Sequence, residues 1–300
     1  MQIALTLVSQ NFIMFLLAGI GFLLFKAKKI SPDGSKGIGN ILIYVVLPGV
    51  IINGFMVERT KEHLVALLLS ALLACIILVI SILMSKLFFR NDPIAAFAAA
   101  FSNPGFFGVP LIIASLTEGA VFYIAAFIGF LNLMQWTYGI SLMTGRQGKI
   151  KIGALVKAPF FISIIVGLLL FLTQCPLPVQ VTNTLSYLAG LNAPLAMFLV
   201  GIYMAQTDLV GMFKKKQIYL ACLVRLVLIP LLSVLVLLPV PMQFMEMKLA
   251  ILIASACPVG SNIAIYAQLH EQDYPYAVEI VVVSTLFSII TIPVIIWIAM

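Results

Sequence analysis

Residues 64–84 read LVALLLSALLACIILVISILM, an apolar run in which no side chain carries a charge. About 20 consecutive apolar residues are what a helix needs to cross the hydrocarbon core of a bilayer. Backbone N–H and C=O groups find no water at that depth, so a spanning segment must be helical or belong to a closed barrel. The run lacks the alternation of barrel strands and therefore predicts a transmembrane helix.

Runs of this kind recur along the whole chain. Of the 300 residues, 63% are hydrophobic and 9% are charged, whereas soluble domains carry about a quarter charged residues. The positive cluster that begins at Lys26 follows the first run, the reverse of a cleaved signal peptide, so the first run is interpreted as a permanent span. We expect an all-α integral membrane protein with ten transmembrane helices near residues 5–25, 38–56, 64–88, 93–115, 119–143, 153–173, 182–206, 217–238, 248–269 and 276–299.

Positive charge is distributed unevenly over the loops that these spans define. Thirteen Lys and Arg residues fall on one side and three on the other. Short cytoplasmic loops are enriched in Lys and Arg, so both termini are expected outside the plasma membrane. The net charge of +7 is then assigned to topology and membrane lipid, and not to nucleic acid. The thirteen are Lys26, Lys28, Lys29, Lys36, Lys86, Arg90, Arg146, Lys149, Lys151, Lys157, Lys214, Lys215 and Lys216.

Matching interruptions about 150 residues apart divide the chain into two halves. Leu47-Pro48-Gly49 in the second span corresponds to Asn192-Ala193-Pro194 in the seventh. Ser102-Asn103-Pro104-Gly105 in the fourth span corresponds to Cys257-Pro258-Val259-Gly260-Ser261-Asn262 in the ninth. Five spans in each half is an odd number, so the second half must enter the membrane inverted. This predicts a five-plus-five inverted repeat of residues 1–150 and 151–300, a plan typical of secondary transporters.

The interruptions of the fourth and ninth spans are the strongest candidates for a binding site. Proline removes a backbone donor and glycine lets the chain leave helical geometry, so we expect each span to unwind there. The two unwound turns can then cross, and the helix ends beyond them can hold an anion. The alternative is a pair of structural kinks. Candidate substrate-binding residues are Ser102, Asn103, Pro104, Gly105, Pro258, Gly260, Ser261 and Asn262, with Asn132 and Gln135 on one face of the fifth span.

Two ionisable residues, Arg225 in the eighth span and Glu279 in the tenth, are expected at similar depth in the membrane. A charge in that environment costs at least about 2.5 kcal/mol and usually pairs or marks a pathway. One interpretation is a mutual salt bridge. The other is that Arg225 attracts an anionic substrate, or that Glu279 carries a proton.

Several classes of protein are not favoured because their motifs are missing. The sequence has no G-x-x-x-x-G-K-[ST], H-E-x-x-H or G-x-S-x-G, so a nucleotide-driven pump and a membrane enzyme have little support. The broken segments hold no paired carboxylates, which argues against sodium/proton antiport. The four cysteines are scattered without metal-ligand spacing. We expect no metal and no cofactor.

Three stretches resemble the auxin efflux carrier family, which includes plant PIN proteins and bacterial permeases for malate and malonate. They are SNPGFFGVP at 102–110, Arg225 with Pro230, and CPVGSN at 257–262. The resemblance covers essentially the whole chain and implies an NhaA/PIN-like fold. Spans 1, 2, 6 and 7 would form a scaffold, spans 3–5 and 8–10 a transport domain, and the protein a homodimer.

The same resemblance places Asn103-Pro104 and Pro258 at the crossing of the fourth and ninth spans, with Asn262 beside it. The chain lacks the long central loop of many plant members, which makes it similar to bacterial ones and auxin an unexpected substrate. We therefore expect a secondary transporter in the bacterial plasma membrane that moves small organic anions, mono- or dicarboxylates, by alternating access. A sodium-coupled bile-acid-type symporter and a non-translocating membrane sensor remain as alternatives.

Overall fold

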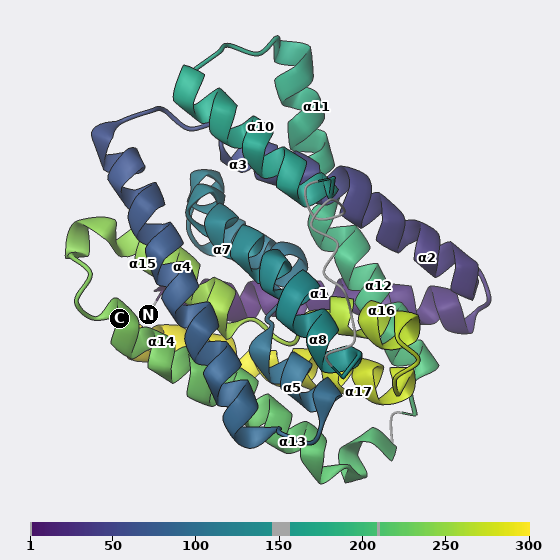
Figure 1. The fold of residues 1–300 in the computed structure, drawn as a ribbon. Helices are drawn as coiled ribbons and strands as arrows, with labels where there is room; N and C mark the ends of the chain where they lie inside the picture. The colour runs from purple at the N-terminus through teal and green to yellow at the C-terminus, as the bar shows by residue number, and fades with distance from the viewer. Residues whose placement is uncertain (1, 146–156, 209–210) are drawn as a thin grey trace.

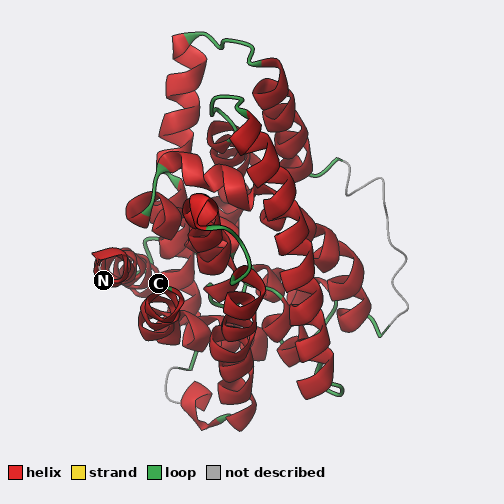
Figure 2. Ribbon diagram, turned by 90° about the vertical axis from the view of Figure 1, so that its left-hand side faces the viewer, coloured by secondary structure: helices red, strands yellow, loops and turns green. Residues whose placement is uncertain are grey.

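The computed structural model describes residues 2–145, 157–208 and 211–300, and the described chain is a bundle of helices joined by short loops (Figure 2). The α-helices are α1 (Gln2–Lys26), α2 (Pro32–Ile41), α3 (Leu47–Gly54), α4 (Lys61–Phe88), α5 (Pro93–Ala100), α6 (Val109–Ser115), α7 (Val121–Met134), α8 (Ile140–Met143), α10 (Pro159–Thr173), α11 (Val179–Gly190), α12 (Asn192–Gln206), α13 (Lys216–Leu223), α14 (Ile229–Leu237), α15 (Met245–Ala256), α16 (Asn262–Leu269) and α17 (Tyr274–Ala299).

Seven helical stretches of the described chain are long and apolar enough to cross a membrane. They are Ile3–Lys26, Pro32–Gly54, Lys61–Phe88, Glu118–Met143, Val179–Gln206, Lys216–Leu237 and Tyr274–Ala299. The other three predicted spans fall on shorter helices: α5 with α6, α10, and α15 with α16. The prediction of an all-helical membrane protein is confirmed, and the count of ten spans stays a prediction.

Most helix boundaries lie close to the predicted ones, and the second span is the clearest error. Its helix begins at Pro32 instead of residue 38, because the Ser31 side chain accepts a hydrogen bond from the N–H of Gly34 and Pro32 occupies the first position. The residues of this first turn are polar, so the search for apolar runs placed the start of the helix too late. The boundary at 150, the basic residues Arg146, Lys149 and Lys151, and the predicted start of the sixth span lie outside the described residues.

Three of the four π-helical turns in the described chain, Leu42–Val46, Pro104–Gly108 and Val224–Leu228, each end two residues before a proline. The prolines are Pro48, Pro110 and Pro230. A proline ring clashes with the carbonyl four residues back, and a wider turn moves that carbonyl aside. The interruptions of these segments are therefore local consequences of the sequence.

Helices from the first and second parts of the chain pack against each other. α1, on the predicted first span, lies against α12 on the predicted seventh, and α10, on the predicted sixth, lies against α3 on the predicted second. This exchange of partners is what an inverted repeat would produce. Figure 1 places α3, α10 and α11 at one end of the view and α5, α13 and α14 at the other. The two chain ends lie close together in both views (Figures 1 and 2).

Candidate functional site

The two predicted interruptions cross each other. Residues between α5 and the π-helical turn at Pro104 run antiparallel to residues between α15 and α16, with Ser102 opposite Val259. The N–H of Asn103 donates to the carbonyl of Pro258 (2.9 Å), and the N–H of Gly260 donates to the carbonyl of Phe101 (3.0 Å). Unwound backbone is tolerated at membrane depth only where protein or a cavity satisfies it. These two bonds supply that satisfaction, and they hold the crossing closed.

The backbones approach so closely at the crossing that side chains are excluded. A Cβ atom on Gly260 would lie 2.9 Å from the carbonyl oxygen of Ser102, and one on Gly108 would lie 3.0 Å from Cys257 Sγ. A real Cβ essentially never approaches a backbone atom to less than 3.0 Å. Glycine at 260 is therefore a requirement of the crossing.

Gly260→Ala is expected to separate the two crossing strands by a few tenths of an ångström and to weaken the bond from the Gly260 N–H to Phe101. We expect a loss of about 1–3 kcal/mol, the usual range for overpacking, measured as a lower Tm of the purified protein. Gly190→Ala is the matched control, because a Cβ there meets no atom within 4 Å. Equal melting temperatures for both variants would contradict the close approach.

Arg225 ties together the two half-helices that lead into the crossing. Its guanidinium donates to the carbonyls of Ala99 (3.1 Å) and Ala100 (3.4 Å) at the end of α5, and to the carbonyl of Ser255 near the end of α15. The side chain is 1% exposed. Helix C-termini carry partial negative charge, so a cation between two of them is favourably placed. Arg225 therefore has a structural reason to be buried that does not involve a ligand.

The predicted salt bridge between Arg225 and Glu279 is wrong. Glu279 is paired with Lys215 from the start of α13, with 2.5 Å between Oε2 and Nζ. The two residues found different partners because Arg225 faces helix ends and Glu279 faces the start of α13. Neither is among the described residues that line the cavity beside the crossing.

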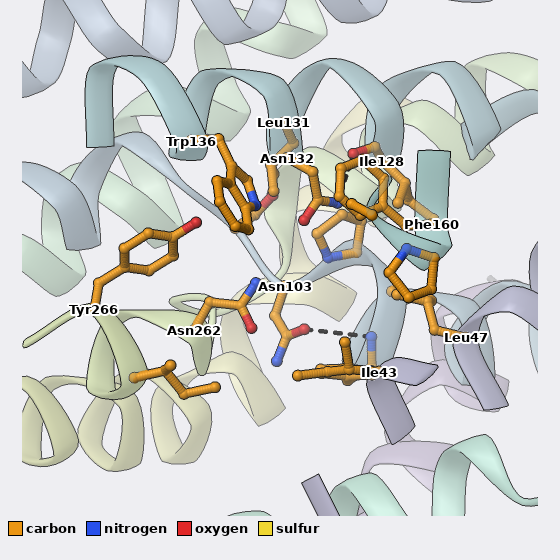
Figure 3. Close-up of a pocket in the computed structure, with 18 of the residues that line it drawn as sticks. Ile43, Leu47, Asn103, Ile128, Leu131, Asn132, Trp136, Phe160, Asn262 and Tyr266 are labelled. Carbon is orange, nitrogen blue, oxygen red and sulfur yellow. Dashed lines mark hydrogen bonds between the residues drawn. The ribbon is translucent and has the colours of Figure 1, made fainter. Parts of the chain in front are cut away.

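A cavity of about 480 Å³ lies against the crossing. Figure 3 shows Asn103 and Asn262 side by side on one wall, with Asn132 and Trp136 pointing toward them from the helix above. Apolar and aromatic side chains complete the walls that the close-up labels: Ile43, Leu47, Ile128, Leu131, Phe160 and Tyr266.

Several polar groups at the cavity retain unused hydrogen-bonding capacity. The Asn262 amide donates to Gln135 Oε1 (3.1 Å), while Asn103 Oδ1 accepts from the N–H of Phe106 (3.3 Å). Ser102 Oγ and Gln135 Nε2 are buried and have no partner in the described chain. Buried polar groups are almost always paired, so each exception calls for a ligand, an ion or water. A hydroxyl and an amide nitrogen are both donors, which suits an acceptor such as a carboxylate.

The structure brings most of the predicted site residues together. Those in the cavity wall are Ser102, Asn103, Pro104, Gly105, Gly260, Asn262 and Asn132. Gln135 contacts the site through Asn262, Pro258 lies within the crossing, and Ser261 faces a neighbouring cavity. The prediction missed the apolar residues of the cavity walls, because in the sequence they do not differ from the apolar residues of other membrane helices. It also did not foresee that Asn192 donates to the Gly105 carbonyl (2.9 Å).

A membrane-embedded helical fold with two broken helices crossing beside a cavity defines a membrane transport protein. The sequence model of the family described as membrane transport protein matches residues 6–155 and 152–296. The chain therefore belongs to this family, the auxin efflux carrier family of permeases. A protein of Rhizobium meliloti (strain 1021) named "Putative malonate transporter" is 27% identical over 284 residues, which cover 87% of this chain and 86% of that protein.

Proposed function

We propose that the protein is a secondary transporter that moves small organic anions, mono- or dicarboxylates, by alternating access. The main support for this proposal is a set of hydrogen-bond donors at the crossing. Ser102 Oγ and Gln135 Nε2 are buried without partners in the described chain. Ser102 lines the cavity together with Asn103 and Asn262, and Gln135 is hydrogen-bonded to Asn262. The helical segments that begin at Pro104 and Asn262 add the partial positive charge of their N-terminal ends. A carboxylate can accept several such bonds at once.

Charge at the cavity supports an anionic substrate. Among its described lining residues, Lys157 carries a positive charge and no carboxylate is present. The name of the Rhizobium meliloti relative, which covers most of this chain, refers to malonate and agrees with a small acid. We infer that the cavity attracts anions and that the crossing holds the carboxylate.

The proposed topology has ten spans, with α5–α6 and α15–α16 each forming one broken span. The basic loops then lie in the cytoplasm of a bacterial cell, both termini lie outside, and the cavity near Lys157 and His270 opens inward. Its walls come from the π-helical turn Leu42–Val46, α3 and α10 of a scaffold and from α7, α16 and the crossing of a transport domain. Movement of one group against the other would expose the crossing to each side in turn.

Asn103→Ala is expected to abolish stabilisation of the purified protein by small carboxylates that bind in the cavity beside the crossing. A ligand that binds only the folded state raises the Tm by mass action, so a panel of small carboxylates identifies the class of acid. The variant removes an amide from the cavity wall and leaves the backbone bond to Pro258 in place. Asn183→Ala, an exposed amide on α11, is the control and should respond as the wild type does.

Flux measurements in liposomes separate the alternatives. A transporter accumulates the labelled acid inside vesicles that contain pure protein, whereas a sensor binds it without flux. Uptake that required sodium would favour the symporter instead. If folded protein responded to no carboxylate at all, the organic-anion function would be rejected.

A further inference from the structure

A second cavity, of about 400 Å³, lies beside the first. The two share Ile43, Phe106, Asn262 and Ile265 as common walls. The second cavity is otherwise bounded by α2, α12, α16 and Tyr274 at the start of α17. It therefore reaches the crossing from another side of α16.

The second cavity has a definite depth and direction. Three helices line it with residues one and two turns apart: Lys36, Asn40 and Ile43 on α2 and its continuation, Leu199, Tyr203 and Gln206 on α12, and Ser261, Ile265 and Gln268 on α16. Seven residues of helix rise about 10 Å. The residues at one end of all three sets, Lys36, Gln206 and Gln268, are exposed, while Ser261 and Tyr203 are buried. This polar, exposed end is the mouth of the cavity.

The lining of the second cavity suits a hydrophilic ligand. Ser261 is 6% exposed and Tyr203 is 8% exposed, and neither hydroxyl has a hydrogen-bond partner within the described residues. Both residues line the cavity, so their hydroxyls are available to bind a polar ligand there. The first cavity, by contrast, is walled mainly by apolar and aromatic side chains. The two compartments differ in chemistry although they meet at Asn262.

The charge of the second cavity is positive. Lys36 is the charged residue among the described side chains that line it. Its ammonium group pairs with Asp33 at 3.2 Å, but the two side chains are 64% and 90% exposed. Exposed pairs of this kind contribute about 0–1 kcal/mol, so Asp33 can be displaced by a ligand. At the other end, Ser261 and Asn262 stand at the N-terminus of α16.

We propose that the polar cavity is a second anion-binding site, which takes a small hydrophilic anion with two acidic groups. One acidic group is bound by Ser261, Tyr203 and the first turn of α16, and the other by Lys36. Anions with a single acidic group and an apolar tail bind in the first cavity instead. The proposal rests on the organic-anion function and adds to it the place and the residue that distinguish a dicarboxylate from a monocarboxylate.

Succinate and butyrate test this assignment, because they have the same four-carbon chain and differ in the second carboxylate. We expect Lys36→Gln to weaken succinate binding to the full-length detergent-purified protein by up to about fivefold, the range for an exposed ion pair, and to leave butyrate binding unchanged. Tyr203→Phe should also weaken succinate selectively, without the loss of a charge. Lys29→Gln is the control, because Lys29 is an exposed lysine just before α2 that does not line the cavity.

The outcomes distinguish this proposal from the proposed function. If both acids bind and Asn103→Ala abolishes butyrate binding, but Lys36→Gln and Tyr203→Phe leave succinate untouched, the second site is overturned and the organic-anion function stands. If the wild type binds neither acid, nor any other carboxylate, both fail together. An equal loss of both acids in Lys36→Gln would indicate a general effect of charge and would also overturn the second site.

A thiol placed at the mouth gives an independent measurement. Gln268→Cys, in a background with Ser at Cys75 and Cys175, the two exposed cysteines of the described chain, should react with a water-soluble thiol reagent. Succinate should slow this reaction at least severalfold, and butyrate should not. Protection by neither acid would contradict occupancy of the polar cavity.

Discussion

Arg225→Met is expected to leave little folded protein, although Arg225 does not line either cavity. Methionine preserves the apolar stem but leaves the carbonyls of Ala99, Ala100 and Ser255 without their donors. Each buried acceptor left unpaired costs about 1–3 kcal/mol, so the loss reaches about 3 kcal/mol even at the low end. Most domains have only about 5–15 kcal/mol in total. The measurement is the Tm and the monodisperse fraction after purification in detergent.

Arg225→Lys separates the charge from the geometry. A lysine keeps the cation between the ends of α5 and α15, but its ammonium lacks the planar fork that lets one guanidinium reach carbonyls on both helices. We expect a stability between those of the wild type and Arg225→Met. If the Arg225→Met protein melted at the wild-type temperature, the hydrogen bonds from Arg225 to α5 and α15 would not stabilise the fold.

The same position distinguishes two interpretations of its role. If Arg225 attracted the substrate, Arg225→Gln would lose uptake while remaining fully folded. Because the guanidinium is 1% exposed and bound to backbone carbonyls, we expect Arg225→Gln to lose thermal stability and uptake together. A glutamine amide can replace at most part of these bonds. Loss of uptake at an unchanged Tm would restore the substrate interpretation.

The crossing could be predicted from the sequence because its causes are local. Pro104 and Pro258 with their neighbouring glycines interrupt a helix wherever they occur, and their spacing along the chain pointed to two related halves. The partners of Arg225 could not be predicted, because they are backbone carbonyls and any sequence supplies those. Only the packing of α5 and α15 against the π-helical turn around Arg225 brings them within reach.

The ion pairs and the residues of the cavity walls could not be predicted from the sequence, for a different reason. The Lys215–Glu279 pair depends on which faces of α13 and α17 are turned toward each other. A helix that is apolar on all sides has no polar and apolar faces in its sequence, so its sequence does not predict that orientation. Lys36 was assigned to topology along with the other basic loop residues. A lysine near the start of α2 can lie on the cytoplasmic side of the membrane and also line the second cavity, so the two roles are compatible.

Gly201→Ala is expected to disrupt the packing of α12 against α1 from a position that lines neither the first nor the second cavity. A Cβ on Gly201 would overlap the carbonyl oxygen of Ala18 and lie 2.7 Å from the backbone N of Phe22. Both are main-chain atoms of α1, so no side chain can move aside and the two helices must separate. Overpacking typically costs about 1–3 kcal/mol, and a clash with backbone belongs at the upper end. Small residues permit this kind of close contact between membrane helices.

Gly19→Ala, also in α1, is the matched control. A Cβ at Gly19 meets nothing within 4 Å, so alanine should be neutral or stabilise α1 by up to about 1 kcal/mol through its higher helix propensity. Gly21→Ala should behave like Gly201→Ala, because its Cβ would overlap the carbonyl oxygen of Phe198. The Gly21 and Gly201 effects should be less than additive, since separating the helices once relieves both clashes.

The loss in Gly201→Ala should extend to ligand binding, because α12 packs against α1 and also contacts the segment that follows the crossing. Asn192 at its start donates to the Gly105 carbonyl, and Tyr203 near its other end lines the second cavity. A shift of α12 away from α1 changes the position of both residues relative to α16. We therefore expect Gly201→Ala to weaken carboxylate binding as well as to lower the Tm. A lower Tm with unchanged affinity would mean that α12 moves without carrying Asn192 and Tyr203 with it.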